Sequence, residues 1–161
     1  MKIGIISDSH DRIENIVKAV KLFQKQKVDF VIHLGDYVNR SSVRAFKGVK
    51  LIGIFGNNDG DQFRIIKAFE EIGGEIKEDF CELEKDGVKF ALYHGKWQEI
   101  TDALIKCGKY DVVLYGHDHV KSKKKIGDTL VLNPGTAHGF GGKATIAIFD
   151  TKTKKSEFFE L

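Results

Sequence analysis

The segment MKIGIISDSHDRIENIVKAVKLF, residues 1–23, contains the pattern that predicts the fold of the chain. Ile3 to Ile6 is a short apolar run typical of a buried strand, and it ends at a polar Ser-Asp-Ser-His stretch. Asp11, followed three residues later by Glu14, is a capping-box sequence that predicts the start of a helix. Apolar residues then recur at helical spacing and predict a buried helix face, formed by Ile13, Ile16, Val17, Val20 and Phe23.

The alternation of strand and helix continues through the first half of the chain. Phe30–Ile32 and Leu51–Phe55 predict two further buried strands, because each is a short continuous apolar run. Ser41–Phe46 and Asp61–Ile72 predict the helices that follow them. In the second of these helices the residues expected to face the core are Ile65, Ile66, Phe69 and Ile72. A β-α-β-α-β-α order predicts parallel strands joined by right-handed crossovers.

The second half of the chain is richer in strands. Asp86-Gly87 is a hairpin signal that joins the predicted strands Phe80–Glu84 and Val88–Tyr93. A helix over Gln98–Cys107 is expected to lead into a strand at Val112–Tyr115. The remaining predicted strands are Ser122–Ile126, Thr129–Leu132, Ala144–Phe149 and Ser156–Phe159. The pattern predicts the α/β class, with two sheets packed face to face, helices outside, and strands apolar on both faces.

The composition excludes several other classes of protein. A chain of 161 residues with no repeat or linker predicts a single domain over residues 1–161. The formal charge of +3 is too small to indicate a nucleic-acid or membrane partner. Cys81 and Cys107 form no disulfide framework or zinc-ribbon spacing, so both are expected to be small buried hydrophobic residues. The first apolar run is too short for a signal peptide or a membrane span, which predicts a cytoplasmic protein.

Side chains of the types that bind metals follow the ends of the predicted strands. Ligands of an open α/β sheet bind beyond the carboxyl ends of its strands, so a site is expected there. The positions concerned are Asp8, His10, Asp36, Asn57, His94, His117 and His119. Two pairs of these residues are spaced i, i+2, which in an extended chain points both side chains to the same side.

The donor types indicate which metals are expected. Carboxylates, imidazoles and one amide oxygen suit divalent Mn, Fe, Co, Ni or Zn, with Mn or Ni the first expectation. Seven ligands are too many for one tetrahedral ion. They fit two ions that lie about 3.5–4 Å apart and share one carboxylate. Glycines beside four ligands, at Gly35, Gly56, Gly95 and Gly116, allow the backbone to turn sharply and approach closely.

Each of these residues also has an ordinary structural explanation. Asp8 and Asp36 are typical turn or capping residues, and Gly56–Gly60 is a good turn sequence. The set as a whole indicates a site, because four of the six histidines follow strand ends. Of the other two, His33 is expected to be a hydrogen-bonded core residue, while His138 borders the site or merely follows the turn before it.

Three other features each have two possible explanations. Trp97 and Phe140 are candidates for stacking a base or aryl group, and core or interface packing explains them equally well. Four lysines within Lys121–Lys125 are typical of a solvated edge strand, and nucleic-acid binding is the weaker explanation.

The ordered motifs resemble those of the calcineurin-like metallophosphoesterases. The DxH, GD, GNxD/E, HG and GHxH motifs of that family are matched by Asp8-Ser9-His10, Gly35-Asp36, Gly56-Asn57-Asn58-Asp59, His94-Gly95 and Gly116-His117-Asp118-His119. Asn133-Pro134-Gly135-Thr136 resembles the NPGS turn of the small bacterial and archaeal phosphodiesterases of this family. The resemblance spans Ile3 to about Thr136 and implies a four-layer αββα sandwich.

The resemblance also implies how the ligands are shared between two ions. One ion is expected at Asp8, His10, Asp36 and His119, and the other at Asp36, Asn57, His94 and His117, with Asp36 bridging. The implied nucleophile is a metal-bridging hydroxide, available near neutral pH because bound metal lowers the pKa of water.

The chain departs from the wider family at two positions beside the ligands. Asn58 and Lys96 stand where histidines are usual, and we expect both to contribute to catalysis together with Asp59. Asparagine donates a hydrogen bond but is no proton-donating acid, and lysine supplies a point charge for a phosphate oxygen. Asp59 is expected to fix the Asn57 loop or to orient a ligand.

These observations lead to one main hypothesis and two alternatives. The main hypothesis is a metal-dependent phosphodiesterase acting on a small diester or nucleotide-like substrate. One alternative is a non-catalytic metal-binding scaffold, as in the retromer subunit that resembles this branch. The other is a phosphomonoesterase or, less in keeping with so compact a chain, a nuclease. A homodimer is compatible with the edge strands of such a unit.

Overall fold

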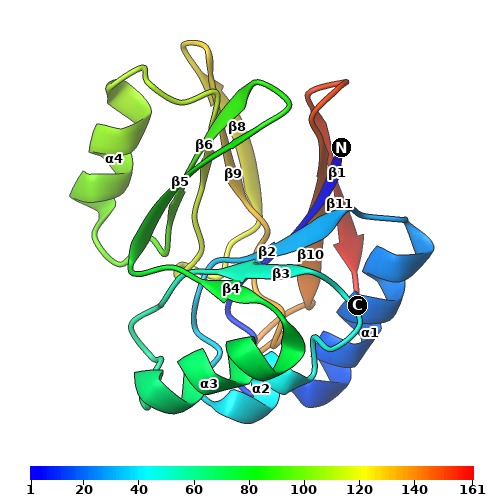
Figure 1. Cartoon of the computed structure of the whole chain (residues 1–161). Helices are drawn as coiled ribbons and strands as arrows, with labels where there is room; N and C mark the ends of the chain where they lie inside the picture. The colour runs from blue at the N-terminus through cyan, green and yellow to red at the C-terminus, as the bar shows by residue number, and fades with distance from the viewer.

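The computed structural model describes all 161 residues and contains two β-sheets that pack against each other (Figure 1). The six-stranded sheet has the order β11-β10-β1-β2-β3-β4. Its strands are β1 (Lys2–Ile6), β2 (Phe30–His33), β3 (Leu51–Gly53), β4 (Glu75–Ile76), β10 (Thr145–Asp150) and β11 (Lys155–Glu160). The five-stranded sheet has the order β5-β6-β7-β9-β8. Its strands are β5 (Phe80–Lys85), β6 (Val88–Tyr93), β7 (Val112–Leu114), β8 (Ser122–Ile126) and β9 (Thr129–Asn133).

Both sheets are mixed, with a parallel centre. Strands β1, β2, β3 and β4 are parallel, while β10 and β11 add antiparallel strands beside β1. Strands β6, β7 and β9 are parallel, and β5 and β8 are antiparallel edge strands. The central parallel strands therefore end at a common edge in each sheet, as the alternation of strands and helices predicts.

The helices cover the two outer faces and give four layers. α1 (Ile13–Lys25), α2 (Arg40–Arg44) and α3 (Gln62–Ile72) pack on the six-stranded sheet through residues such as Phe23, Val43 and Phe69. α4 (Gln98–Lys106) packs on the five-stranded sheet through Ile105. A separate apolar cluster fills the space between the two sheets. The αββα sandwich is therefore confirmed (Figure 1).

The predicted capping box is wrong, because the carboxylate of Asp11 has partners from a distant segment. It accepts hydrogen bonds from Asn39 Nδ2 at 2.5 Å and from Ser42 Oγ at 2.6 Å. Helix α1 begins at Ile13 without a side-chain cap. The Asp11 carboxylate thus binds α2 and the residue before it in place of the first turn of α1. These hydrogen bonds fix the loop after β1 to the start of α2.

Several smaller predictions are also wrong. Val17 and Ile66 lie at the edges of their helix faces and are 38% and 37% exposed, and Cys107 is exposed rather than buried. The two-residue strand β4 was missed because so short a segment has no periodicity. The edge strands β5, β8 and β11 are partly exposed, so only the central strands are apolar on both faces.

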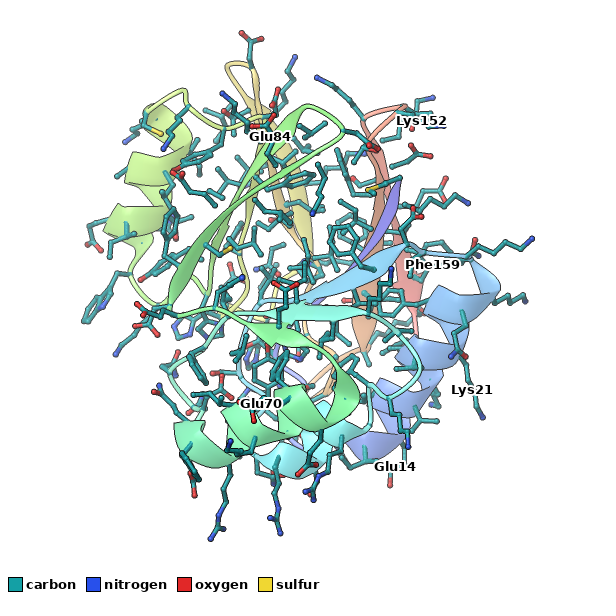
Figure 2. The ribbon with its side chains drawn as sticks, in the orientation of Figure 1. Glu14, Lys21, Glu70, Glu84, Lys152 and Phe159 are labelled. Carbon is teal, nitrogen blue, oxygen red and sulfur yellow. The ribbon has the colours of Figure 1, made fainter.

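The exposed surfaces carry the charged residues. Figure 2 shows Glu14 and Lys21 extending from the outer side of α1, and both are exposed. The lysine-rich strand β8 is an exposed edge, which agrees with the edge-strand explanation of its charge. No helix in the structure combines the length and apolar character needed to cross a bilayer.

Candidate metal centre

The candidate centre lies where the parallel strands of the two sheets end. Within the first sheet, the amide of Asp8 donates to Gly35 O at 3.1 Å, which joins the loops after β1 and β2. Between the sheets, His94 Nδ1 contacts Leu34 O at 2.7 Å and the amide of His117 donates to Asp8 Oδ2 at 3.1 Å. The two bonds between the sheets bring together residues that are 60 and 109 positions apart in the sequence.

The backbone at the expected ligands is left-handed rather than extended. The φ angles are 54° at Asp8, 38° at His10, 62° at Asp36, 71° at His117 and 62° at His119. The premise of an extended chain at the two i, i+2 pairs is therefore wrong. Non-glycine residues in this region cost free energy, and they persist only where the surrounding structure holds them. Five such residues in one cluster indicate a functional site.

Two buried carboxylates and three imidazoles form the centre of the cluster. Asp36 Oδ2 lies 3.4 Å from both His10 Nε2 and His94 Nε2. Asp8 Oδ1 lies 3.3 Å from His119 Nε2 and 3.8 Å from His10 Nε2. Asp36 and Asp8 are 1% and 0% exposed, so these carboxylates are removed from water and depend on the surrounding groups for compensation.

Three buried atoms of this cluster have no hydrogen-bond partner: Asp8 Oδ1, His10 Nε2 and His94 Nε2. A buried polar atom without a partner costs about 1–3 kcal/mol. For His94 the protonation pattern is fixed, because Leu34 O can only accept and Nδ1 must therefore carry the proton. In the neutral ring the lone pair of Nε2 then faces Asp36 Oδ2 at 3.4 Å, and either a proton on Nε2 or a metal cation between the two atoms would remove this repulsion.

The charges of the cluster shift the pKa values of its members. Burial alone would raise the pKa of Asp8 and of Asp36, but the nearby imidazoles hold both pKa values well below the usual range. Asp36 and Asp8 raise the pKa of His10 to about 9. Burial opposes the charged form of His94, but Asp36 and Asp8 outweigh it and raise the pKa of His94. The cluster thus contains two ionised carboxylates, and they stabilise positive charge on the groups around them.

Asp59 ties the Asn57 loop to the loop of Asp36. Its two carboxylate oxygens accept from the backbone N–H groups of Gly56, Asp36, Tyr37 and Val38 at 2.6–2.9 Å. Asp59 is 6% exposed, and burial raises its pKa while these backbone donors favour its charged form. This geometry agrees with the expectation that Asp59 fixes the Asn57 loop.

Gly56 shows why a glycine is needed in this loop. A Cβ atom at this position would lie 2.2 Å from Asp36 Oδ1, far inside van der Waals contact. Gly116 is similar on the other sheet, since a Cβ there would lie 2.8 Å from Asp8 Oδ2. Both carboxylates therefore lie against backbone that can bear no side chain.

Asn58, which is expected to contribute to catalysis, contacts Asp36. Its backbone N–H donates to Asp36 Oδ1 at 2.8 Å, and its Nδ2 donates to Asp36 Oδ2 at 2.7 Å. Two hydrogen bonds from one residue orient the carboxylate plane. In this structure Asn58 is therefore a residue that positions Asp36.

The other expected residues lie around this centre. The ring of His117 is 5.2 Å from the ring of His94, centroid to centroid. Asn57 and Lys96 are exposed and line a cavity beside His94. The structure thus brings six of the seven expected ligands into one cluster, with Asn57 at its margin.

His138 lies at the centre, one of the two placements left open by the sequence. Its ring is 4.9 Å from that of His10 and 4.8 Å from that of His119, centroid to centroid. The backbone amides of Ala137 and His138 donate to Ser7 O and Asp8 O, so the glycine-rich turn after β9 packs on the loop after β1. The Asn133–Thr136 turn was the sequence signal for this placement.

The protonation of His138 distinguishes it from the metal-binding histidines. Ligand atoms of His10, His119 and His138 lie within 4.8 Å of one another, which is close enough for a shared ion. However, His138 Nδ1 accepts from the backbone N–H of Phe140 at 2.6 Å, so Nε2 carries the proton of the neutral ring. Burial lowers the pKa of His138 to about 4, and its Nε2–H faces His119 Nδ1 at 3.4 Å. His138 therefore offers a hydrogen-bond donor rather than a lone pair.

His33 is a core residue, as expected. It is fully buried, its Nδ1 accepts from Gly35 N–H at 3.2 Å, and its Nε2–H donates to Ser9 Oγ at 3.0 Å. Both hydrogen bonds go to the loops that carry Asp8 and Asp36. His33 thus holds the two loops that carry Asp8 and Asp36 and is not itself one of the expected ligands.

Two cavities border the cluster. One of about 500 Å³ has His94, Asn57, Lys96 and Trp97 in its wall. The other, about 460 Å³, is lined by His10, Arg12, His119, His138 and Phe140. These volumes are in the range of small-molecule sites.

The residues present fit divalent metal ions. The free Nε2 lone pair of His94 and the unpartnered Asp8 Oδ1 face the same buried region, where two ionised carboxylates concentrate negative charge. Imidazole and carboxylate ligands together suit borderline transition-metal cations.

Comparisons with known proteins agree with this geometry. A family model described as the calcineurin-like phosphoesterase superfamily domain matches residues 1–154. A phosphodiesterase of Methanocaldococcus jannaschii is 41% identical over 159 residues, which cover 96% of each chain. A solved archaeal phosphodiesterase is similar with a TM-score of 0.95 and 39% identity, covering 100% of both chains. The solved Zn²⁺ complex of Vps29 from Entamoeba histolytica has a TM-score of 0.72 at 14% identity, covers 99% of this chain and 91% of its own, and shares the fold alone.

The ordered motifs, the αββα sandwich and the buried carboxylate–imidazole cluster are thus explained together by common descent. The chain belongs to the calcineurin-like phosphoesterase superfamily, a family of metal-dependent phosphoesterases.

Proposed function

We propose that this chain is a phosphodiesterase that hydrolyses a small phosphodiester with the help of two divalent metal ions. The observation that carries the proposal is the set of unpartnered buried atoms around Asp36, above all the free lone pair of His94 Nε2. The phosphodiesterase of M. jannaschii, 41% identical over nearly the whole chain, supports the choice of a diester.

In this proposal Asp36 is shared by the two ions. Its Oδ2 is 3.4 Å from one histidine of each expected ligand set, His10 and His94, which supports a bridging role. Asp8, His10, Asp36 and His119 would hold one ion, and Asp36, Asn57, His94 and His117 the other. Two divalent ions bound there would activate water near neutral pH and neutralise the charge on the phosphoryl oxygens.

The remaining polar residues of the centre position groups or bind the phosphate. Asn58 orients Asp36 through two hydrogen bonds. Lys96 places an ammonium group in the wall of the cavity beside His94, where it is able to hold a phosphate oxygen. His138 presents Nε2–H beside His10 and His119 and is a donor for an oxygen on that side.

The proposal is tested by removing and restoring the metal. Protein stripped with a chelator is reconstituted separately with Mn, Ni, Co, Mg or Zn, and the bound metal is counted by mass spectrometry. Each sample is assayed on bis(p-nitrophenyl) phosphate and on p-nitrophenyl phosphate. We expect two ions per chain, no activity in the stripped protein, and faster cleavage of the diester.

The outcomes separate the alternatives. Bound metal without cleavage of either ester would support a non-catalytic scaffold. Faster cleavage of the monoester would support a phosphomonoesterase. A single ion at saturation would contradict the two-metal centre.

A further inference from the structure

Each of the two cavities beside the metal centre has an exposed aromatic ring with a cation next to it. In the cavity beside His94, Trp97 is 56% exposed and Lys96 Nζ lies 5.5 Å from its ring centroid. In the cavity beside His10, Phe140 is 78% exposed and Arg12 Cζ lies 6.0 Å from its ring centroid. The two cavities thus repeat the same chemistry, and each includes a histidine whose Nε2 lies 3.4 Å from Asp36 Oδ2.

The exposure of these rings is unusual for their size. Tryptophan is highly buried on average, and the chain has only this one. Ligand pockets are lined largely by apolar and aromatic side chains, so an exposed ring in the wall of a cavity beside the centre is placed to contact a ligand. An aromatic face flanked by a cation is the combination that stacks nucleic-acid bases while the charge follows the phosphate backbone.

The backbone of each aromatic residue is held by hydrogen bonds. Trp97 N–H donates to Tyr93 Oη at 3.2 Å, and its carbonyl accepts from the first turn of α4. Phe140 N–H donates to His138 Nδ1 at 2.6 Å. The main chain is therefore fixed at both positions while the side chain extends into solvent, so truncating either ring removes no core contact.

We propose that the substrate carries a planar aromatic group of the nucleoside type on each side of the phosphate, with one group on Trp97 and the other on Phe140. This inference rests on the proposed phosphodiesterase function, because a diester has two arms and each ring shares a cavity with a different histidine of the centre. The arms of a dinucleotide or of a nucleotide aryl ester have this form. Binding energy from the two stacked arms is also available to lower the barrier at the phosphate.

The test compares two esters with the same leaving group in the metal-loaded protein. The p-nitrophenyl ester of thymidine monophosphate has a base on the second arm, whereas methyl p-nitrophenyl phosphate has one carbon there. We expect kcat/KM to be about 10-fold higher for the nucleotide ester, since stacking of one base contributes at this level. The variants are Trp97→Ala and Phe140→Ala.

The variant that lacks the ring holding the base should lower the ratio of the two kcat/KM values towards one. This result identifies the ring that holds the base arm. The other variant should lower kcat/KM for both esters alike, because both have the same aryl leaving group. The matched control is Phe63→Ala on α3, which is 70% exposed beside Lys67 Nζ at 5.9 Å but belongs to neither cavity. A ratio that stays unchanged in both variants overturns the proposal.

The single tryptophan gives a second readout that does not need turnover. A dinucleoside analogue with a methylene group in place of the bridging ester oxygen is titrated while the fluorescence of Trp97 is followed. We expect saturable quenching, with an affinity that falls about 10-fold in Phe140→Ala. Absence of quenching contradicts the proposal even if the protein is an active esterase.

The same variants distinguish a dimer contact from a substrate contact. Sedimentation of wild-type protein and Trp97→Ala shows whether the ring holds two copies together. Loss of a dimer with an unchanged ester ratio would overturn the assignment of Trp97. Absence of hydrolysis of methyl p-nitrophenyl phosphate with every metal would instead count against the phosphodiesterase function, while the fluorescence titration still tests the two rings.

Discussion

The floor and the rim of the candidate centre are held in different ways. The floor consists of Asp8, Asp36, Asp59 and His94, which are at most 6% exposed and are fixed by hydrogen bonds to backbone or to neighbouring loops. The rim consists of Lys96, Trp97 and Phe140, all of which are exposed.

This difference separates two kinds of function. A floor residue sets the position of the charges, so changing it affects metal binding and the folded structure together. A rim residue meets the ligand through a side chain that the fold does not need, so changing it affects recognition alone.

Substitution of the shared carboxylate should have the largest effect. Asp36→Asn removes a charge that faces both His10 and His94, so we expect kcat to fall by about 10³-fold and the metal content to decrease. Mass spectrometry and the diester assay measure both quantities. Asp128→Asn, a fully exposed isosteric change, is the control. Wild-type turnover in Asp36→Asn would show that this carboxylate is not the bridge.

Leaving-group dependence tests whether the rim contains a proton donor. Asn58 and Lys96 replace the usual histidines, and Asn58 is engaged with Asp36. A missing general acid costs about 10²–10⁴-fold for poor leaving groups. We therefore expect methyl p-nitrophenyl phosphate to be cleaved at least about 100-fold faster than dimethyl phosphate. Equal rates would reveal an acid elsewhere, and His138→Gln would then be the first variant to examine.

A pair of glycine variants tests how closely one loop approaches the floor. In Gly56→Ala the new Cβ would lie 2.2 Å from Asp36 Oδ1, whereas at Gly60 nothing lies within 4 Å. We expect Gly56→Ala to weaken metal binding by about 10–100-fold, as displacement of a ligand by its supporting shell does. Gly60→Ala should bind metal like the wild type. Calorimetric titration with Mn²⁺ measures the difference, and equal affinities would contradict the close approach of the two loops.

The smallest effect concerns His33 beneath the floor and depends on pH. Burial lowers the pKa of His33 to about 3, so between that pH and about 6.5 the unfolded chain binds a proton that the folded chain does not. This group therefore lowers stability as the pH falls below 6.5 and has no effect above it. Urea unfolding at about pH 7.5 and about pH 5 should show that the wild type loses about 2 kcal/mol more than His33→Gln on acidification. An equal loss in both proteins would show that the buried ring is not the source.

Much of the fold could be predicted because it depends on local patterns. Apolar runs and helical spacing identified the strands and helices except β4, and the Asp86-Gly87 hairpin signal correctly joins β5 to β6. The exceptions arise where a distant group competes with a local one. Asp11 caps no helix because Asn39 and Ser42 donate to it, and Val17 and Ile66 lie just outside the faces that the sheet covers.

The chemistry of the centre follows from the sequence, because carboxylates and imidazoles follow the strand ends in an order that matches one family. The orientation of these groups depends on the tertiary structure. The left-handed backbone at the ligand positions, the four N–H groups on Asp59, the proton on His94 Nδ1 and the place of His138 all depend on the sheets and loops meeting. Their partners lie tens of residues away, and periodicity in a sequence describes only the contacts that a segment makes with its own neighbours.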